Sequence, residues 1–219
     1  MKQILSSVPL CVALAVSTLF VAVASGDTTA IGPFVGDLTE DFESFQNYVD
    51  NPDFYEAQPM SIFGGTALAT TGSGSSIAIY EPNAGATFGL GPAGSAQVAD
   101  GEKAFGLDEI GSIFIDFDQG ITEFGGYWAA TTSFSDPTTI TFNFFDTGGG
   151  FIDTEIITYE TNDAGVLLWA GWSSDTQIGS VEIFGEFVVA DSLQANVPEP
   201  GTSLLLLTLG ALTCGRRRR

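Results

Sequence analysis

The segment Thr138–Glu160 reads TTITFNFFDTGGGFIDTEIITYE, and this pattern decides the fold class. Its first part, Thr138–Phe145, is rich in threonine and phenylalanine, which favour strands because they fit a pleated, half-buried surface. The residues Asp146–Gly150 then have the composition of a tight turn. Strand-like sequence resumes over Phe151–Glu160, so the segment predicts a β-hairpin.

Strand-like sequence continues on both sides of this hairpin. Apolar side chains alternate along Ser112–Phe117, and Val181–Val189 places its apolar residues opposite Glu182 and Glu186. The apolar run Val166–Trp172 follows a turn-forming sequence. Short runs separated by turn residues, without a convincing amphipathic helix, are typical of an all-β sandwich or barrel. Further strands are expected at 40–45, 60–70, 76–81, 85–88, 96–99, 103–107 and 121–130.

The body of the chain is strongly acidic. The 219 residues carry a formal net charge of −21, and residues 27–196 hold 26 of the 27 acidic residues but only one basic residue, Lys103. Such a surface repels the phosphate backbone, which argues against nucleic-acid partners. Hard cations prefer oxygen ligands, so a specific ion site and simple solubility in a salty medium are both open interpretations.

The residue types required by several catalytic mechanisms are absent from the body. The chain contains no histidine, and its two cysteines, Cys11 and Cys214, lie in the terminal apolar segments. Imidazole-assisted nucleophilic catalysis and the usual zinc sites are therefore excluded. Glycoside hydrolysis by paired carboxylates is formally possible, but no pattern indicates it, and we expect a protein that is not an enzyme.

The N-terminus has the three parts of an export signal. Lys2 provides the positive charge, an uncharged apolar run covers Ile4–Val23, and Ala22 and Ala24 fit the small-residue rule for cleavage. We expect signal peptidase to remove residues 1–24 or 1–26. A retained N-terminal membrane helix is the alternative.

The C-terminus also has three parts. Pro198, Glu199 and Pro200 form a stiff, non-helical spacer because each proline fixes its own φ. An apolar stretch follows, shorter than the roughly 20 residues that usually span a bilayer as a helix. Four arginines, Arg216, Arg217, Arg218 and Arg219, then end the chain and favour a cytoplasmic position.

These C-terminal features resemble the PEP-CTERM sorting signal, which has a Pro-Glu-Pro tripeptide, a short transmembrane helix and an arginine cluster in this order. The resemblance implies an exported substrate of an exosortase, a membrane cysteine protease that cuts near the tripeptide. It also implies transient anchoring in the inner membrane, then a place at the cell envelope or outside the cell, in bacteria that make extracellular polysaccharide. An ordinary tail-anchored protein is the alternative.

The body resembles the extracellular jelly-roll domain often found upstream of this signal, and carbohydrate-binding modules more broadly. Four loose motifs carry the resemblance, at 41–45, 121–128, 144–146 and 181–193. We therefore expect a signal peptide at 1–26, an all-β domain of the jelly-roll β-sandwich type at 27–196, and a sorting tail at 197–219. The expected fold has an N-terminal signal-peptide helix and a short C-terminal transmembrane helix as flanks.

The resemblance to jelly-roll modules implies a possible structural calcium ion between the first and last strands. The carboxylates at those positions are Asp41, Glu43 and Asp191. Calcium takes six to eight oxygen ligands, so backbone carbonyls would supply several of them. The alternative is that these three side chains are solvated acids at strand ends.

Aromatic side chains are the candidates for sugar stacking. Trp128 and Trp172 are the predicted stacking residues, with Tyr127 and Trp169 as neighbours. Trp169 and Trp172 are three residues apart, so they should point to opposite faces of the sheet. The alternative is that these rings belong to an aromatic core.

Two functions of different class remain from the sequence. The first is a non-catalytic exported surface or extracellular-matrix protein, sorted by its tail and associated with exopolysaccharide. The second is a carbohydrate-binding module with a structural calcium ion.

Overall fold

The computed structural model describes residues 27–45, 59–72, 75–80, 98–107, 110–130, 138–159 and 166–199. These residues form eleven strands and one short 3-10 turn, Phe63–Gly65, which confirms the all-β class. The strands are β1 (Thr28–Ile31), β2 (Leu38–Glu40), β3 (Met60–Ile62), β4 (Ala67–Thr71), β5 (Ile77–Tyr80), β6 (Ala104–Leu107), β7 (Ile110–Ala129), β8 (Thr138–Asp146), β9 (Phe151–Tyr159), β10 (Leu168–Glu186) and β11 (Val189–Asn196).

The two flanking helices expected from the sequence lie outside the described residues. Within the described part of the chain, no helix has the length and apolar character needed to cross a membrane.

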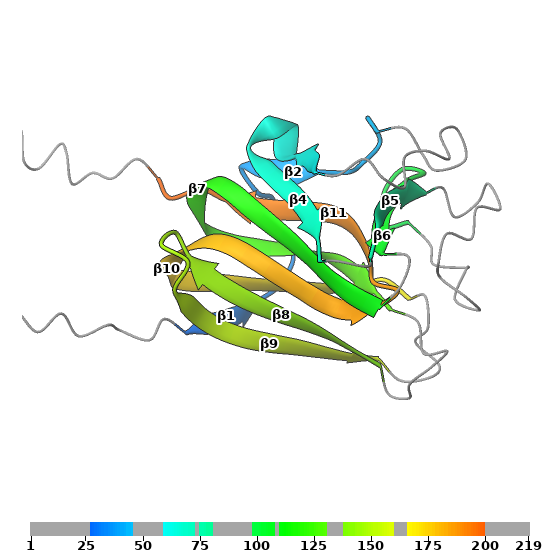
Figure 1. Cartoon of the computed structure of the whole chain (residues 1–219). Coiled ribbons are helices and arrows are strands. Elements are labelled where there is room, and N and C mark those ends of the chain that lie inside the picture. Colours follow the sequence, from blue (N-terminus) through cyan, green and yellow to red (C-terminus); the bar gives the residue numbers. More distant parts are fainter. Residues whose placement is uncertain are drawn as a thin grey trace, which may run out of the picture.

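The long strands β7 and β10 each contribute to two layers (Figure 1). They pair with each other in antiparallel fashion, but the register shifts between Ser173 and Ser180. Such irregularities bend a strand and increase its twist, and both strands pass from one layer to the other at this point. The result is an open sheet whose two layers are consistent with a β-sandwich.

The pairing register assigns the other strands to one layer or the other. In the first layer, the order is β3, β4, residues 110–117 of β7, residues 180–186 of β10, β8 and β9. In the second layer, β1 pairs with the beginning of β10, which pairs with the end of β7, and β11 follows. Strands β2 and β6 both pair with β11, and β5 pairs with β6.

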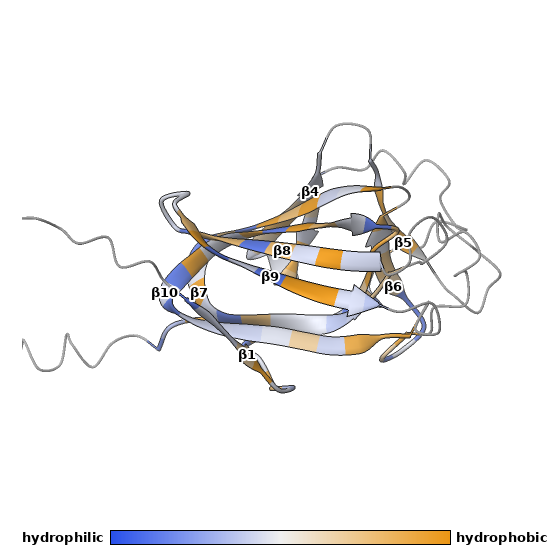
Figure 2. Ribbon diagram, turned by 90° about the horizontal axis from the view of Figure 1, so that it is seen from below, coloured by the Kyte–Doolittle hydropathy of each residue, from blue (hydrophilic) through white to orange (hydrophobic). Residues whose placement is uncertain are grey.

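The hairpin read from the sequence is present as β8 and β9. Buried and more exposed residues alternate along β8, so that one face of the layer packs inward. Figure 2 shows β8 and β9 side by side, each with hydrophobic and hydrophilic residues. The carboxylate of Asp146 closes the turn, because its Oδ1 accepts hydrogen bonds from the amides of Gly148 at 2.8 Å and Gly150 at 2.7 Å. Gly149 adopts a φ of +80°, which glycine tolerates without steric cost.

The structure corrects the predicted limits of several strands. The segment 181–189 was expected to be one strand, but β10 ends at Glu186 because Phe187 has a φ of +47° and redirects the chain into β11. Similarly, the expected strand 40–45 ends at Glu40, since Phe42 has a φ of +61°. The separate strands expected at 112–117 and 121–130 are one strand, β7, because both pair with β10. The expected strand 85–88 and residues 96 and 97 lie outside the described residues, and residues 98 and 99, expected in a strand, are not in one.

A polar contact joins the edge strands of the two layers. Thr28 begins β1, and both its amide and its hydroxyl donate to Oδ2 of Asp153 on β9, at 3.0 and 2.9 Å. The Thr28 hydroxyl also lies 2.9 Å from Oε1 of Glu155. The amide of Thr28 is the main cause that lowers the pKa of Asp153 below its ordinary value. The start of the body is therefore fixed to the opposite layer.

Candidate functional site

The outward face of the first layer combines polar and aromatic side chains. We call it the Glu182 face. Its members come from the central strands and from β9, and the register places them in neighbouring rows. They are Ser112, Phe114, Asn143, Phe145, Thr154, Glu182 and Phe184.

The carboxylate of Glu182 is held in place at the centre of this face. Its Oε1 accepts a hydrogen bond from the hydroxyl of Ser112 at 2.8 Å, and its Oε2 accepts one from Nδ2 of Asn143 at 3.1 Å. The amide oxygen of Asn143 in turn accepts from the hydroxyl of Thr154 at 2.7 Å. Each carboxylate oxygen can accept further bonds, so this fixed group is suited to bind hydroxyl donors.

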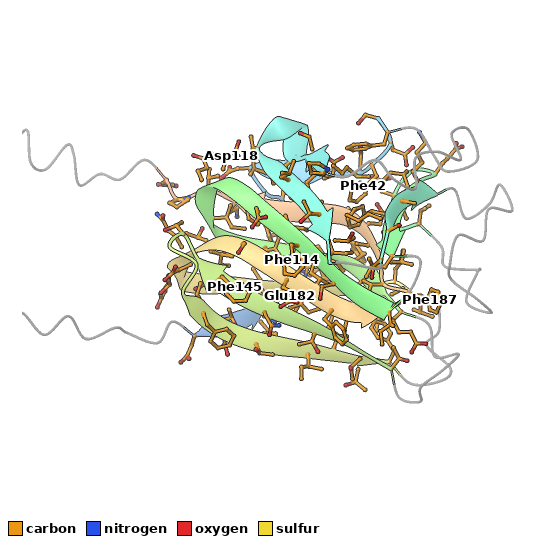
Figure 3. The ribbon with its side chains drawn as sticks, in the orientation of Figure 1. Phe42, Phe114, Asp118, Phe145, Glu182 and Phe187 are labelled. Atoms are coloured by element: carbon orange, nitrogen blue, oxygen red, sulfur yellow. The ribbon has the colours of Figure 1, made fainter. Side chains whose placement is uncertain are left out.

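Phenylalanines flank this polar centre on the same outward face. Phe114 and Phe145 are half-buried, and Figure 3 shows them on either side of Glu182. Phe184 is 45% exposed, and Phe151, which meets Phe145 edge to face, is 62% exposed. Exposed rings beside ordered polar groups present the surface that a sugar ring requires, an apolar face with hydrogen-bond partners at its rim.

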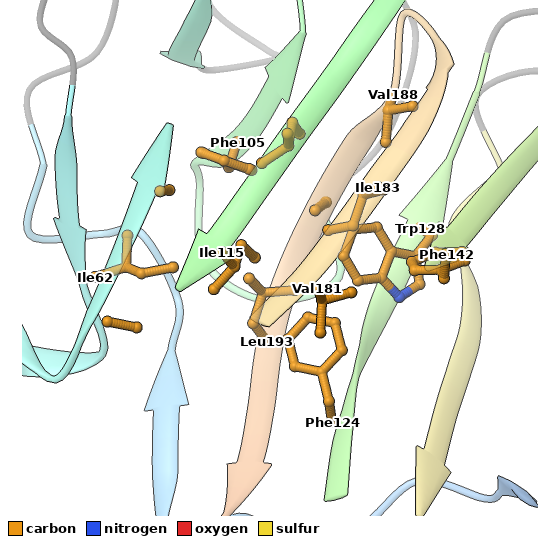
Figure 4. Close-up of a cluster of buried hydrophobic side chains, with 14 of the residues drawn as sticks. Ile62, Phe105, Ile115, Phe124, Trp128, Phe142, Val181, Ile183, Val188 and Leu193 are labelled. Carbon is orange, nitrogen blue, oxygen red and sulfur yellow. The ribbon is translucent and has the colours of Figure 1, made fainter. Parts of the chain in front are cut away.

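The two tryptophans predicted to stack on sugars are instead core residues. Trp128 is 0% exposed and Trp172 is 3% exposed. The ring centroid of Phe142 lies 4.9 Å from that of Trp128 and 4.5 Å from that of Trp172. Figure 4 shows Phe142 beside Trp128. The prediction for these two residues is corrected, because the alternation of β7 and β10 turns both toward the interior. The core interpretation, which the sequence also allowed, holds for them.

The outward face of the second layer carries the remaining tryptophan. Trp169 points away from the core, which confirms that it and Trp172 lie on opposite faces. Its indole lies over Gly171, where a side chain would collide with the ring, and Tyr127 and Phe34 meet it edge to face. Its Nε1 donates to the carbonyl of Ile31 at 3.1 Å. Through these contacts, the ring holds residues 31–34 against β10.

The carboxylate of Asp191 is fully buried and surrounded by amide donors. Its Oδ2 accepts from the amides of Ala99 and Asp100, and its Oδ1 accepts from the amide of Ser192. Burial raises its pKa above the ordinary value, and these hydrogen bonds oppose that effect. Asp191 therefore attaches the segment before β6 to the last strand.

The other two residues of the predicted calcium set lie on the turn after β2. Glu43 accepts from the amides of Glu102 and Lys103 through Oε1, each at 2.7 Å. Asp41 is exposed and accepts from the amide of Glu43 at 3.1 Å. Lys103 places its ammonium on the carbonyls of Glu43 and Phe45, at 2.9 and 2.6 Å.

Glu43 and Asp191 thus bind the same short segment, residues 99–103, by different amides. Within the described residues, no group of three acidic, histidine or cysteine side chains is close enough to hold a metal ion. Calcium binding by Asp41, Glu43 and Asp191 stays a prediction.

The sequence did not reveal Glu40, which is buried and accepts hydrogen bonds from the amides of Phe42 and Phe63. Burial raises the pKa of Glu40.

The C-terminal segment leaves the body directly from the last strand. Asn196 is the final residue of β11, and Val197 still packs against the core. Pro198 is half-buried, Glu199 is exposed, and Pro200 and the residues after it lie outside the described part. No residue of flexible linker composition separates the strand from the tripeptide.

Residues 196–219 match the PEP-CTERM protein-sorting motif. The chain ends in a PEP-CTERM tail. This motif indicates an exported protein that is a substrate of an exosortase. The predicted sorting residues Pro198, Glu199 and Pro200 and the arginines 216–219 lie within the matched segment.

Comparisons of the whole chain gave distant structural neighbours and no match among curated proteins. The K2 cleaved adhesin domain of Lys-gingipain has a TM-score of 0.45 at 12% identity, over 73% of this chain and 97% of that one. A DUF4465 family protein from Bacteroides caccae has a TM-score of 0.43 at 14% identity, over 81% and 96%. A family 61 carbohydrate-binding module, solved with β-1,4-galactotriose, has a TM-score of 0.36 at 16% identity, over 69% and 98%.

Proposed function

We propose that this chain is a non-catalytic exported surface protein whose PEP-CTERM tail is cut by an exosortase. The observation that carries this proposal is the tail itself, which follows the last strand of the body without a linker. Signal peptidase removes residues 1–24 or 1–26, and the short apolar stretch after the tripeptide holds the protein in the inner membrane until the cut. The body, a sandwich that we assign to the jelly-roll type, then acts at the cell envelope or outside the cell.

Processing at both ends is tested by replacing the sorting tripeptide. With alanine at Pro198, Glu199 and Pro200, we expect the tail to remain, whereas the export signal is still removed. Intact-mass analysis of the protein from the host measures both ends in one spectrum. Alanine at two exposed residues, Thr29 and Asp175, is the control, and this variant should be processed normally. Unchanged processing of the tripeptide variant would contradict recognition of the tripeptide.

We further propose that the Glu182 face is where the body contacts extracellular polysaccharide. A polysaccharide offers hydroxyl donors for the fixed Glu182 carboxylate and C–H surfaces for the flanking phenylalanines. A polyanionic glycan fits poorly, because residues 27–196 carry a net charge of −25 by the count of 26 acidic residues against one lysine. The ligand class favoured by this face is therefore a neutral polysaccharide.

Removing the exposed rings should remove this binding. For the double variant Phe145→Ala and Phe184→Ala, we expect at least a tenfold weaker affinity for a neutral glycan found on an array, since each lost stacking contact contributes about 1 kcal/mol. The variant Val35→Ala, at a side chain that is 91% exposed beside the tail, is the control and should bind normally. Titration calorimetry of the secreted protein measures the affinities. Equal affinities for the double variant and the wild type would refute this assignment of the face.

The alternative function is a carbohydrate-binding module with a structural calcium ion. It is supported by the convergence of Glu43 and Asp191 on the segment 99–103, since one cation at that place would join the turn after β2 to the last strand. The same glycan array, run with calcium and with a chelator, separates the two candidates. Calcium-dependent, specific binding favours the module, and binding unaffected by the chelator favours the surface protein.

A further inference from the structure

The residues just before the sorting tripeptide lie in an internal strand. Gln194 pairs with Thr39 of β2 on one side and with Gly125 of β7 on the other. Leu193 and Ala195 on the same strand are fully buried in the core. Opening this strand would break pairing on both of its sides and expose core side chains, and such segments open at a cost near that of global unfolding.

A set of side-chain hydrogen bonds secures the end of the same strand. The amide of Asp37 donates to Oδ1 of Asn196 at 2.8 Å, and Nδ2 of Asn196 donates to Oε2 of Glu123. The hydroxyl of Thr122 donates to the carbonyl of Asn196 at 3.3 Å. We call these contacts the Asn196 clamp. They fasten both the side chain and the backbone of the last strand residue to β7 and to the segment before β2.

Access to the chain begins immediately after the clamp. An open hollow of about 560 Å³ runs beside Pro198 and Glu199, and its wall includes Val35, Asp37 and Glu123. Glu199 is exposed, whereas Val197 still packs against the core. The boundary between protected and approachable backbone therefore falls between Val197 and Glu199.

The start and the end of the body also lie at the same end of the sheet. Thr29 pairs with Ser173, Ser173 with Glu123, and Glu123 with Asn196. One row of paired residues therefore crosses the sheet from the first strand to the last, with β10 and β7 between them. Three strand spacings separate Thr29 from Asn196, or about 14 Å. Figure 1 shows β1 and the end of β11 on the same side of the molecule. The export signal and the tail therefore join the body at one end, which faces the membrane while either is inserted.

The sequence limits the gap between this end and the membrane. Leu204, the first residue of the leucine run, follows Val197 by seven residue steps, which span at most about 25 Å when fully extended. A membrane protease must reach its bond within this gap. It needs extended backbone with free amide and carbonyl groups, which is the form in which enzymes and receptors bind peptides along an edge.

We propose that the folded body sets the N-terminal limit of processing, so that the tail is cut only at bonds after Pro198. This inference rests on the exosortase processing proposed above and specifies where in the chain it can occur. The reaction breaks one C–N bond: the hydroxyl of water completes the new carboxyl group on the body, and its hydrogen completes the new amino group on the tail. No unfolding of β11 is required, because Pro198 and Glu199 already lie outside the sheet.

The C-terminal residue of the mature protein tests this limit. Tandem mass spectrometry of the full-length protein processed in its host should find a chain that ends at Pro198 or later. A mature chain that ends at Val197 or earlier would overturn the inference. If the tail is not cut at all, the proposed function fails, and the limit is then tested by a second measurement on the uncut protein.

The second measurement is limited digestion with proteinase K under native conditions. In the wild type, we expect the tail to be trimmed back to Pro198 or Glu199 and no further while the body stays intact. The variant Asn196→Ala removes the two side-chain hydrogen bonds of the clamp. It should lose residues 193–197 about thirtyfold faster, since each of these bonds contributes roughly 1 kcal/mol. The variant Asn143→Ala, which removes a similar amide pair on the Glu182 face, should show the wild-type limit. Trimming of the wild type past Val197, or equal rates for Asn196→Ala and the wild type, would contradict the role of the clamp.

Discussion

The substitution Trp128→Ala is expected to lower the free energy of unfolding by about 3–5 kcal/mol, the usual cost of emptying a large aromatic site in a core. The indole is fully buried against Phe142 and Phe124, and its Nε1 donates to the carbonyl of Ala170. The backbone carbonyl of Trp128 accepts a hydrogen bond from the hydroxyl of Tyr159 at 2.7 Å. For a body of this size, the loss corresponds to a melting temperature lower by roughly 10 °C, which calorimetry measures.

Trp169→Ala provides the matched control for this prediction. The same residue type is removed from the outward face of the second layer, where solvent already reaches part of the ring. We expect a clearly smaller decrease in melting temperature. If Trp128→Ala abolished glycan binding without loss of stability, the stacking interpretation from the sequence would be restored and the core assignment would be wrong.

The substitution Asp191→Asn is expected to lower the free energy of unfolding by about 3 kcal/mol, although it only replaces one carboxylate oxygen by an amino group. Both carboxylate oxygens accept from amides, Oδ2 from Ala99 and Asp100 and Oδ1 from Ser192. The side-chain amino group of asparagine is a donor, and it would face one of these backbone amide donors. Removal of one partner from a buried, charged group of hydrogen bonds costs several kcal/mol. Urea unfolding measures the loss, provided that the slope with urea concentration is unchanged.

The control for this substitution is Asp175→Asn, at an exposed position of β10. It should change the free energy of unfolding by less than about 0.5 kcal/mol, as is usual for surface positions.

The same samples test the calcium proposal. If calcium binds Asp191, it should raise the melting temperature of the wild type and of Asp175→Asn but not that of Asp191→Asn. A wild type that melts at the same temperature in calcium and in chelator would contradict a calcium site.

The hairpin at 138–159 was predictable because its signal is local. Threonine and phenylalanine mark its first strand, and the glycines at 148–150 mark its turn, so neighbouring residues contain the information. The limits of β10 and β2 were not predictable in this way. They depend on Phe187 and Phe42, which adopt a positive φ that their residue type disfavours and that the surrounding packing imposes.

For the candidate site too, local patterns in the sequence were informative and pairings between distant segments were not visible. Alternation along β7 and β10 indicated that Trp169 and Trp172 face opposite sides, but it did not show which side is the interior. The Glu182 face depends on pairing between strands far apart in sequence, since Ser112, Asn143 and Glu182 come from three strands. Phe114 and Phe145, aromatic residues at positions that alternate with the core, were the signal that could have indicated this face.

By itself, the sequence determined the all-β class, the acidic body and the PEP-CTERM tail. Each of these is a property of composition or of residues adjacent in the chain, so no contact is needed to read it. Only the tertiary structure decided which tryptophans are core, where the Glu182 carboxylate is held, and that β11 lies between two partner strands up to Ala195. These properties depend on the pairing of distant segments, and the physical reason is that burial and strand register are set by the whole sheet.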